Sequence, residues 1–127
     1  MNTQELVDLI DRLRALPTET EWLEFKHNNT DPQEIGEYLS ALANEACLCN
    51  KARGYLVFGI DDITHDVVGT HFDPYINKGK GNQDFLPWLG ALLQPNPGVD
   101  VHVVAHPDGR VVLLAWGRSV ERGQKCF

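Results

Sequence analysis

Three stretches of the chain repeat apolar residues every three or four positions, which places those residues on one face of an α-helix. The first stretch, Thr3–Leu16, has Asn2 in position to cap it. The second starts at Asp31-Pro32, a capping residue followed by proline in the first helical position, and should fray out within Cys47–Asn50. The third is Asn82–Leu93, which begins at its own capping residue. The pattern therefore predicts three helices.

Shorter segments have the patterns of β-strands. These segments are Glu21–Lys26, Gly54–Ile60, Val67–Gly69, Val99–Ala105 and Arg110–Trp116. Alternation in the first segment places Leu23 and Phe25 on one face of the strand, and it places Trp22, Glu24 and Lys26 on the other face. The second segment is almost continuously apolar, as in a strand buried on both sides. A Pro-Asp-Gly turn joins the last two segments into a hairpin.

The order of these elements indicates one α+β domain, with a mixed or antiparallel sheet flanked by helices. A length of 127 residues suits a single domain, and 43% hydrophobic residues suffice for a core. No apolar run approaches the roughly 20 residues that cross a bilayer, and no apolar leader follows Met1, so we expect no membrane partner. Three cysteines, an odd number, fit free thiols in a cytoplasmic protein.

The charge is distributed unevenly along the chain. The net formal charge is −7, to which residues 1–66 contribute −8 and residues 67–127 contribute +1. A protein that binds nucleic acid over its whole surface needs clustered lysine and arginine side chains for the phosphates. We therefore expect a polyanion to contact the second half of the chain, or to need a bound cation that masks the carboxylates.

Four short motifs follow one another along the chain. They are Glu19–Lys26 (ETEWLEFK), Ser40–Asn44 (SALAN), Gly54–Asp62 (GYLVFGIDD) and Val68-Gly69. This series resembles the AlbA-like DNA-binding domain of bacterial proteins, which is shared with the Schlafen core. The resemblance covers roughly residues 19–116. It implies a nucleic-acid-binding domain of a bacterial regulator or defence protein.

The resemblance also implies domain borders. We expect an N-terminal helix at residues 1–17, the AlbA-like domain at residues 18–117, and a tail at residues 118–127 where a longer protein is truncated. The chain departs from the family pattern before its third motif. The family passes from the asparagine of the second motif to a Gly-Gly pair within a few residues, whereas here Glu45–Arg53 precede a single Gly54. A remodelled turn is therefore expected before that strand.

Schlafen proteins include metal-dependent ribonucleases, and the resemblance carries their carboxylates onto Glu19, Glu24, and Asp61 or Asp62. Such a cluster would hold Mg²⁺ or Mn²⁺, because both ions prefer carboxylate oxygens and can activate water at a phosphodiester. The alternative reading needs no metal. In that reading Glu24 and Lys26 form an ordinary charge pair, and the two aspartates serve a tight turn.

Basic and aromatic residues offer a second kind of site. Lys78 and Lys80 alternate with glycines in the segment 74–82, which exposes backbone amides beside two ammonium groups. With Lys26 and Arg110 they are the predicted nucleic-acid contacts. The alternative is a flexible connector whose lysines only aid solubility. The aromatic residues available for base stacking, unless the core takes them, are Trp22, Tyr55, Tyr75, Trp88 and Trp116.

Three functions remain open at this point: nucleic-acid binding, a metal-dependent endoribonuclease, and a protein-protein module that forms a homodimer. Binding alone should weaken as salt rises, because phosphate contacts release counterions. A nuclease should require Mg²⁺ or Mn²⁺. A dimerisation module, served by the apolar first helix, should sediment as an oligomer without either property. Both DNA and RNA fit the resemblance.

Overall fold

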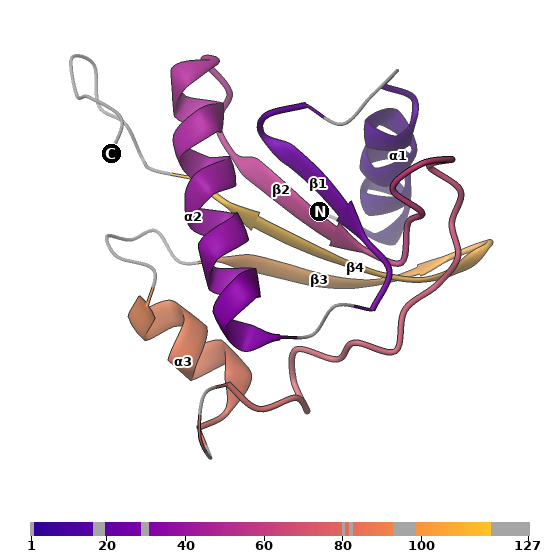
Figure 1. Ribbon diagram of the computed structural model, residues 1–127. Coiled ribbons are helices and arrows are strands. Elements are labelled where there is room, and N and C mark those ends of the chain that lie inside the picture. Colours follow the sequence, from indigo (N-terminus) through magenta and orange to yellow (C-terminus); the bar gives the residue numbers. More distant parts are fainter. Residues whose placement is uncertain are drawn as a thin grey trace.

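The computed structural model describes residues 2–16, 20–28, 31–79, 81, 83–92 and 99–117. The α+β class is confirmed, with helices and strands in the order shown in Figure 1. Their bounds are α1 Thr3–Arg14, β1 Leu23–Lys26, α2 Pro32–Leu48, β2 Gly54–Phe58, α3 Phe85–Leu92, β3 Asp100–His106 and β4 Gly109–Trp116. Within these ranges, no helix is both long and apolar enough to cross a membrane.

The four strands form one mixed sheet in the order β1-β2-β4-β3. Strands β1 and β2 are parallel, with Leu23 opposite Tyr55 and Lys26 opposite Phe58. A parallel pair needs a crossover connection, and helix α2 supplies it. The pairs β2–β4 and β4–β3 are antiparallel, and the last is the predicted hairpin. The carboxyl ends of β1 and β2 therefore meet at the same edge of the sheet.

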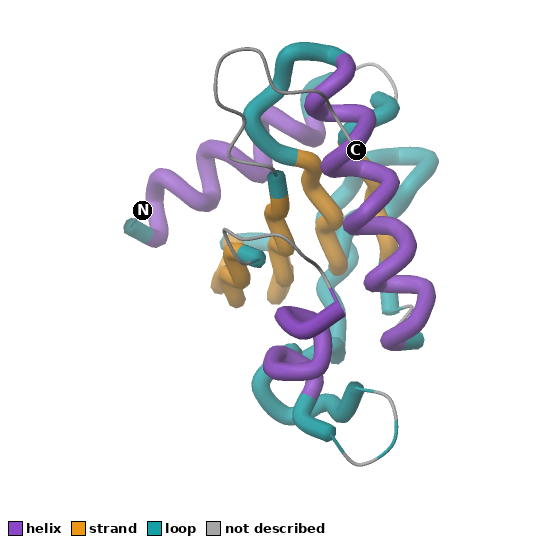
Figure 2. Tube along the Cα trace, turned by 90° about the vertical axis from the view of Figure 1, so that its left-hand side faces the viewer, coloured by secondary structure: helices purple, strands orange, loops and turns teal. Residues whose placement is uncertain are grey.

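The sheet lies between helices, with α1 against one face and α2 against the other (Figure 2). Helix α3 packs on the α2 side. The core on that side joins helical and strand residues, including Ile35, Leu39, Leu42, Phe58, Phe85, Leu89, Val112 and Leu114. The core on the α1 side includes Leu6, Ile10, Leu13, Leu23, Phe25, Val57, Val111 and Leu113.

The predicted alternation of the first strand holds for Leu23 and Phe25, which are fully buried on the α1 side. It is wrong for Trp22, which packs against the same α1-side core and makes an edge contact with Tyr55. The reason is that Trp22 lies in the turn before β1, where the period of two has not yet started.

Helix α2 ends where the sequence departs from the family pattern. It continues to Leu48, and Asn50 then takes a left-handed conformation with φ of 60°. The N–H of Lys51 donates to Ala46 O at 2.7 Å, and the N–H of Asn50 donates to Cys47 O at 3.1 Å. These two bonds define a Schellman motif, which satisfies the last carbonyls of the helix. The predicted end of the helix within Cys47–Asn50 is confirmed, and the remodelled turn is this motif.

Other element borders differ from the predictions. Strand β2 ends at Phe58, because Gly59 has a φ of +101° and leaves the extended conformation. The predicted strand Val67–Gly69 is reduced to one isolated bridge between Ile60 and Val67. Helix α1 stops at Arg14, two residues earlier than predicted. The predicted cap and end of the third helix, Asn82 and Leu93, lie outside the described residues.

The cysteines also differ from the expectation. Cys47 takes part in a disulfide, whereas Cys49 is a free, exposed thiol. The prediction of free thiols is therefore wrong for Cys47.

Candidate nucleic-acid interface

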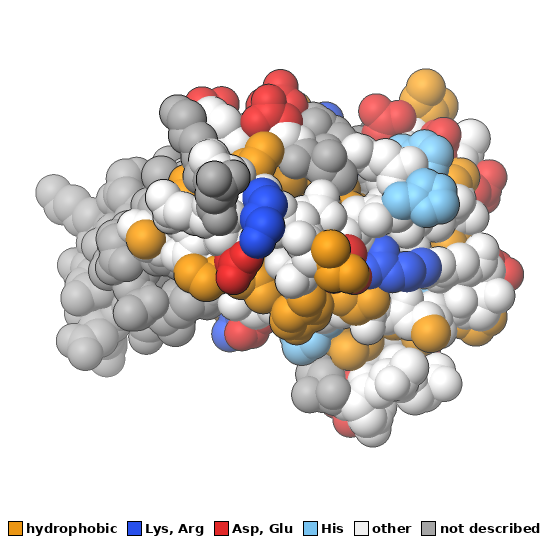
Figure 3. Space-filling model, turned by 90° about the horizontal axis from the view of Figure 1, so that it is seen from below, with side chains coloured by type: hydrophobic (Ala, Val, Ile, Leu, Met, Phe, Trp, Pro, Cys, Tyr) orange, Lys and Arg blue, Asp and Glu red, His pale blue; other side chains and the backbone are white. Residues whose placement is uncertain are grey.

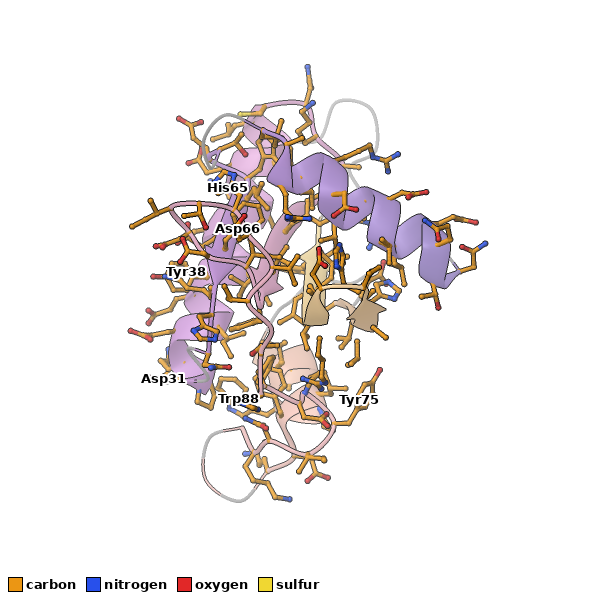
Figure 4. The ribbon with its side chains drawn as sticks, turned by 90° about the vertical axis from the view of Figure 1, so that its right-hand side faces the viewer. Asp31, Tyr38, His65, Asp66, Tyr75 and Trp88 are labelled. Carbon is orange, nitrogen blue, oxygen red and sulfur yellow. The ribbon has the colours of Figure 1, made fainter. Side chains whose placement is uncertain are left out.

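The arrowheads of β1 and β2 point to the right in Figure 1, which is the side from which Figure 4 is seen. Ligands of open α/β sheets commonly bind beyond the carboxyl ends of such strands. The predicted carboxylates Glu24 and Asp61 and the predicted contact Lys26 all come from this parallel pair or the turn after it.

Lys26 is engaged inside the protein. Its Nζ lies 3.3 Å from Glu24 Oε1 and 4.6 Å from the centroid of the Tyr38 ring on α2. Both charged side chains are only about a quarter exposed, at 22% for Lys26 and 27% for Glu24. Burial lowers the pKa of Lys26, but its hydrogen bonds to Tyr38 and Glu24 outweigh burial and raise the pKa above its usual value. This ion pair matches the alternative reading of the two residues.

Asp61 organises the turn that follows β2. The backbone N–H groups of Ile63 and Thr64 both donate to Asp61 Oδ1, each at 2.8 Å. These bonds to Thr64 and Ile63 hold the pKa of Asp61 below its usual value, and the nearby His27 adds to the effect. The turn-forming role expected in the alternative reading is present. Asp62 is exposed on the same turn.

His65 fastens this turn to the end of α1. The Nε–H of Arg14 donates to His65 O at 2.7 Å, and His65 Nδ1 lies 3.1 Å from Arg14 O. The His65 ring also meets Phe25 edge-on, with centroids 4.8 Å apart. Figure 4 shows His65 and Asp66 together at one end of the face. These contacts give His65 a structural role, even though its φ of 62° is unusual for a residue with a side chain.

The predicted metal ligands are only partly described. Within the described ranges, no three His, Cys, Asp or Glu residues lie close enough together to hold a metal ion. Glu24 and Asp61 are therefore not brought together with a third ligand there, and Glu19 lies outside those ranges. Two buried polar atoms of the motif segments, Thr20 Oγ1 and Asn44 Oδ1, have no hydrogen-bond partner among the described residues.

Arg110 holds the segment that leads away from the turn. Its Nη1 donates to Thr70 O at 3.2 Å and also to Phe72 O, and its Nη2 lies 3.7 Å from Asp73 Oδ2. The side chain is still 35% exposed. Arg110 therefore anchors the chain after Thr70 to the β3–β4 hairpin and keeps part of its guanidinium at the surface.

The described residues on either side of the lysine and glycine segment are bonded to each other. The N–H of Gly79 donates to Gln83 O at 2.8 Å, and Lys78 and Asp84 form an isolated β-bridge. Lys78 Nζ also pairs with Asp84 Oδ1 at 2.6 Å, although both side chains stay exposed, at 59% and 71%. Lys80 lies outside the described residues.

An exposed aromatic residue lies on the segment between Asp73, which is the partner of Arg110, and Lys78. Tyr75 is 66% exposed, and its N–H donates at 2.9 Å to Oδ1 of Asp73, the carboxylate that also faces Arg110. We call Tyr75, Ile76, Lys78 and Arg110 the Tyr75 surface. Figure 3 shows this side of the molecule, where two basic groups, each beside an acidic one, flank hydrophobic side chains.

Comparison with known proteins identifies the family. The profile of the family described as Schlafen, AlbA_2 matches residues 19–125. The chain belongs to this family. No curated protein matches it. A similar solved structure is that of the DIP2311 protein from Corynebacterium diphtheriae, with 22% sequence identity, coverage of 93% of this chain and a TM-score of 0.43. The chain spans 23% of that protein.

In this Schlafen AlbA_2 chain, the sequence indicated the basic residues and the pairing of Lys26 with Glu24, but not the acidic partners of Lys78 and Arg110. Lys26, Lys78 and Arg110 each face a carboxylate. The partner of Lys78 is six residues away along the chain, so it lay within reach of sequence reasoning. The partner of Arg110, Asp73, is distant in the sequence and gave no signal. The Tyr75 surface is therefore less positive than its cations alone suggest.

Proposed function

We propose that this Schlafen AlbA_2 domain binds nucleic acid through the Tyr75 surface. The observation that carries the proposal is the exposed Tyr75, three residues before Lys78, on a turn held by Asp73, which also faces Arg110. Stacking of one base on an aromatic side chain is worth about 1–3 kcal/mol. The flanking cations supply phosphate contacts of the kind that position a nucleic-acid backbone.

The acidic partners do not prevent such contacts. Exposed ion pairs such as Lys78–Asp84 are worth about 0–1 kcal/mol, so Lys78 can exchange its carboxylate for a phosphate. With a net charge of −7 and two cations on the Tyr75 surface, binding there should be weak. Two phosphate contacts imply that log K falls with log salt at a slope of about −2. Binding therefore has to be measured at low salt.

The test is the retardation of labelled duplex DNA, single-stranded DNA and tRNA at low salt, in EDTA so that no cleavage intervenes. Tyr75→Ala and Lys78→Ala should weaken binding, whereas Asp84→Asn, which frees Lys78, should strengthen it. Lys26→Gln is the matched control, because it removes one positive charge from a side chain already held by Glu24 and Tyr38. Equal losses in Lys26→Gln and Lys78→Ala would mean that only net charge matters, and that result would refute the proposal.

The other functions remain predictions. These are the metal-dependent endoribonuclease with Glu19, Glu24 and Asp61 or Asp62, the homodimeric module, the regulator or defence role, and the cytoplasmic location. Cleavage of tRNA in Mn²⁺ and a sedimentation experiment test the first two.

A further inference from the structure

A second group of basic and aromatic side chains lies at the opposite end of the parallel pair. It forms a pocket of about 280 Å³ between α1 and the amino ends of β1 and β2. Trp22 and Tyr55 line it with two rings whose centroids are 6.2 Å apart and whose planes are inclined by 65°. Leu9 and Leu13 of α1 supply an apolar wall. We call this cavity the Trp22 pocket.

Cations surround the Trp22 pocket. Arg12 reaches it from α1, and Lys51 and Arg53 reach it from the segment before β2. The Nζ of Lys51 lies 5.5 Å from the centroid of the Trp22 ring. Arg53 also pairs with Asp100, and both of these side chains are well exposed, at 37% and 50%. Three of the five basic residues in the acidic first half of the chain, residues 1–66, thus line one cavity.

The departure from the family pattern supplies two of these cations. Helix α2 continues to Leu48, and the Schellman motif at Asn50 then turns the chain into β2. Lys51 and Arg53 lie on this connection, and both line the pocket. A direct passage from Asn44 to the glycine before β2 would contain neither residue. The added segment therefore places two positive charges at the pocket, in addition to changing the turn before β2.

We propose that the Trp22 pocket holds one unpaired nucleobase of a bound nucleic acid, with the adjoining phosphate on Arg12, Lys51 and Arg53. The base stacks on the Trp22 ring in place of the Lys51 ammonium, which then turns to the phosphate. This assignment rests on the proposed nucleic-acid binding and names its single-stranded subsite.

Size and charge favour this occupant. Small-molecule pockets start at about 300 Å³, so a cavity of 280 Å³ suits one aromatic ring system and not two. A purely apolar ligand would make no use of the cations at the rim, of which Arg53 already pairs with Asp100. A nucleotide combines the two features that the pocket offers, a flat π-face for stacking and a phosphate for the cations.

Tryptophan fluorescence reports this subsite directly. The chain has three tryptophans, of which Trp88 and Trp116 are only 8% and 2% exposed, so stacking by a ligand affects Trp22. Adenosine 5′-monophosphate should quench the emission, and both adenosine and ribose 5-phosphate should bind more weakly because each lacks one of the two features. Trp22→Phe should abolish the quenching and so assign the signal.

Matched variants separate this subsite from the Tyr75 surface. Arg12→Gln and Lys51→Gln should each lower the affinity for adenosine 5′-monophosphate about fivefold, the effect of a partly exposed charge contact. Lys78→Ala should leave that affinity unchanged. Absence of quenching, or equal affinity for adenosine and its monophosphate, overturns the inference. If single-stranded DNA still binds in a manner that depends on Lys78, the proposed function survives that result. If no nucleic acid binds either, both proposals fall.

Discussion

Helix α2 passes close to the sheet at Gly54, and replacing this glycine tests how the helix and the sheet pack together. A Cβ atom at this position would lie 2.4 Å from Leu42 C, 2.6 Å from Leu42 O and 2.7 Å from Ala43 N. All three atoms belong to the backbone of α2, so no side-chain rotation relieves the contact. Gly54→Ala therefore forces the helix away from β2.

The size of the effect follows from the distance that the helix must move. Restoring an ordinary contact of 3.4 Å from 2.4 Å requires a shift of about 1 Å. A gap of 0.5–1 Å forfeits a quarter to a half of the dispersion energy of the atoms that line it. The α2 side chains that bear this loss are Ile35, Leu39, Leu42 and Ala43. Burial of each large side chain is worth about 1.5–3 kcal/mol, so we expect Gly54→Ala to cost about 3 kcal/mol.

The assay is urea unfolding followed by far-ultraviolet circular dichroism, with a thermal melt that should shift down by about 10 °C. Gly81→Ala is the control, because a Cβ at Gly81 meets nothing within 4 Å while its φ of +70° is strained for alanine. That strain costs about 1–2 kcal/mol. The explanation is wrong if Gly54→Ala costs no more stability than Gly81→Ala. It is also wrong if adding Leu42→Ala restores the stability of Gly54→Ala, because truncating the Leu42 side chain cannot relieve a contact with backbone atoms.

Three further changes test the local structure and the open functions. Asn50→Gly should raise the free energy of unfolding by about 0.5 kcal/mol, because glycine accepts the left-handed conformation at the end of α2 without strain, and a thermal melt measures the gain. The pKa of Asp61 is lowered in the folded state by its bonds to Thr64 and Ile63, so its stabilising contribution is complete above pH 3.8 and is lost as pH falls through the folded pKa. Nuclear magnetic resonance titration should show this low pKa, and Asp61→Ala should flatten the acid limb of the stability curve. Glu24→Gln should leave nucleic-acid retardation in EDTA unchanged, and the nuclease hypothesis additionally predicts that it abolishes tRNA cleavage in Mn²⁺.

Periodicity predicted the fold because the buried faces repeat regularly. Helices α1 and α2 and the hairpin β3–β4 each present a continuous apolar face. The sequence pattern therefore predicts these elements, and only their end residues differ from the structure. The failures have local causes. Trp22 lies one residue before its strand, and the positive φ of Gly59 ends β2 early. The pattern of apolar and polar residues predicts neither the turn at Trp22 nor the positive φ of Gly59.

The candidate site was harder to predict, since the same residue types serve chemistry and structure. The resemblance predicts Asp61 as a metal ligand, yet its Oδ1 accepts two N–H groups of its own turn. Arg110 is a predicted phosphate contact, yet it also donates to the carbonyls of Thr70 and Phe72. Whether such a side chain serves structure or ligand binding depends on its hydrogen-bond partners, and for Arg110 these lie far away in the sequence. The Trp22 pocket was missed for the same reason, because its cations come from α1 and from the segment before β2.

Arg110 of the Tyr75 surface and the Trp22 pocket lie at the two ends of β2, and this placement predicts which ligands can use both. Arg110 lies beside Gly59 at the carboxyl end of β2, and Tyr55 and Arg53 lie at its amino end. A strand of five residues spans about 17 Å, the axial length over which a nucleic-acid strand carries about five phosphates. Single strands shorter than about five nucleotides should therefore engage one surface, whereas longer ones engage both and gain affinity by effective concentration. In a series of oligonucleotides of increasing length, affinity should rise steeply near that length in the wild type and only gradually in Lys51→Gln. A gradual rise in both proteins would show that the two surfaces do not share one strand.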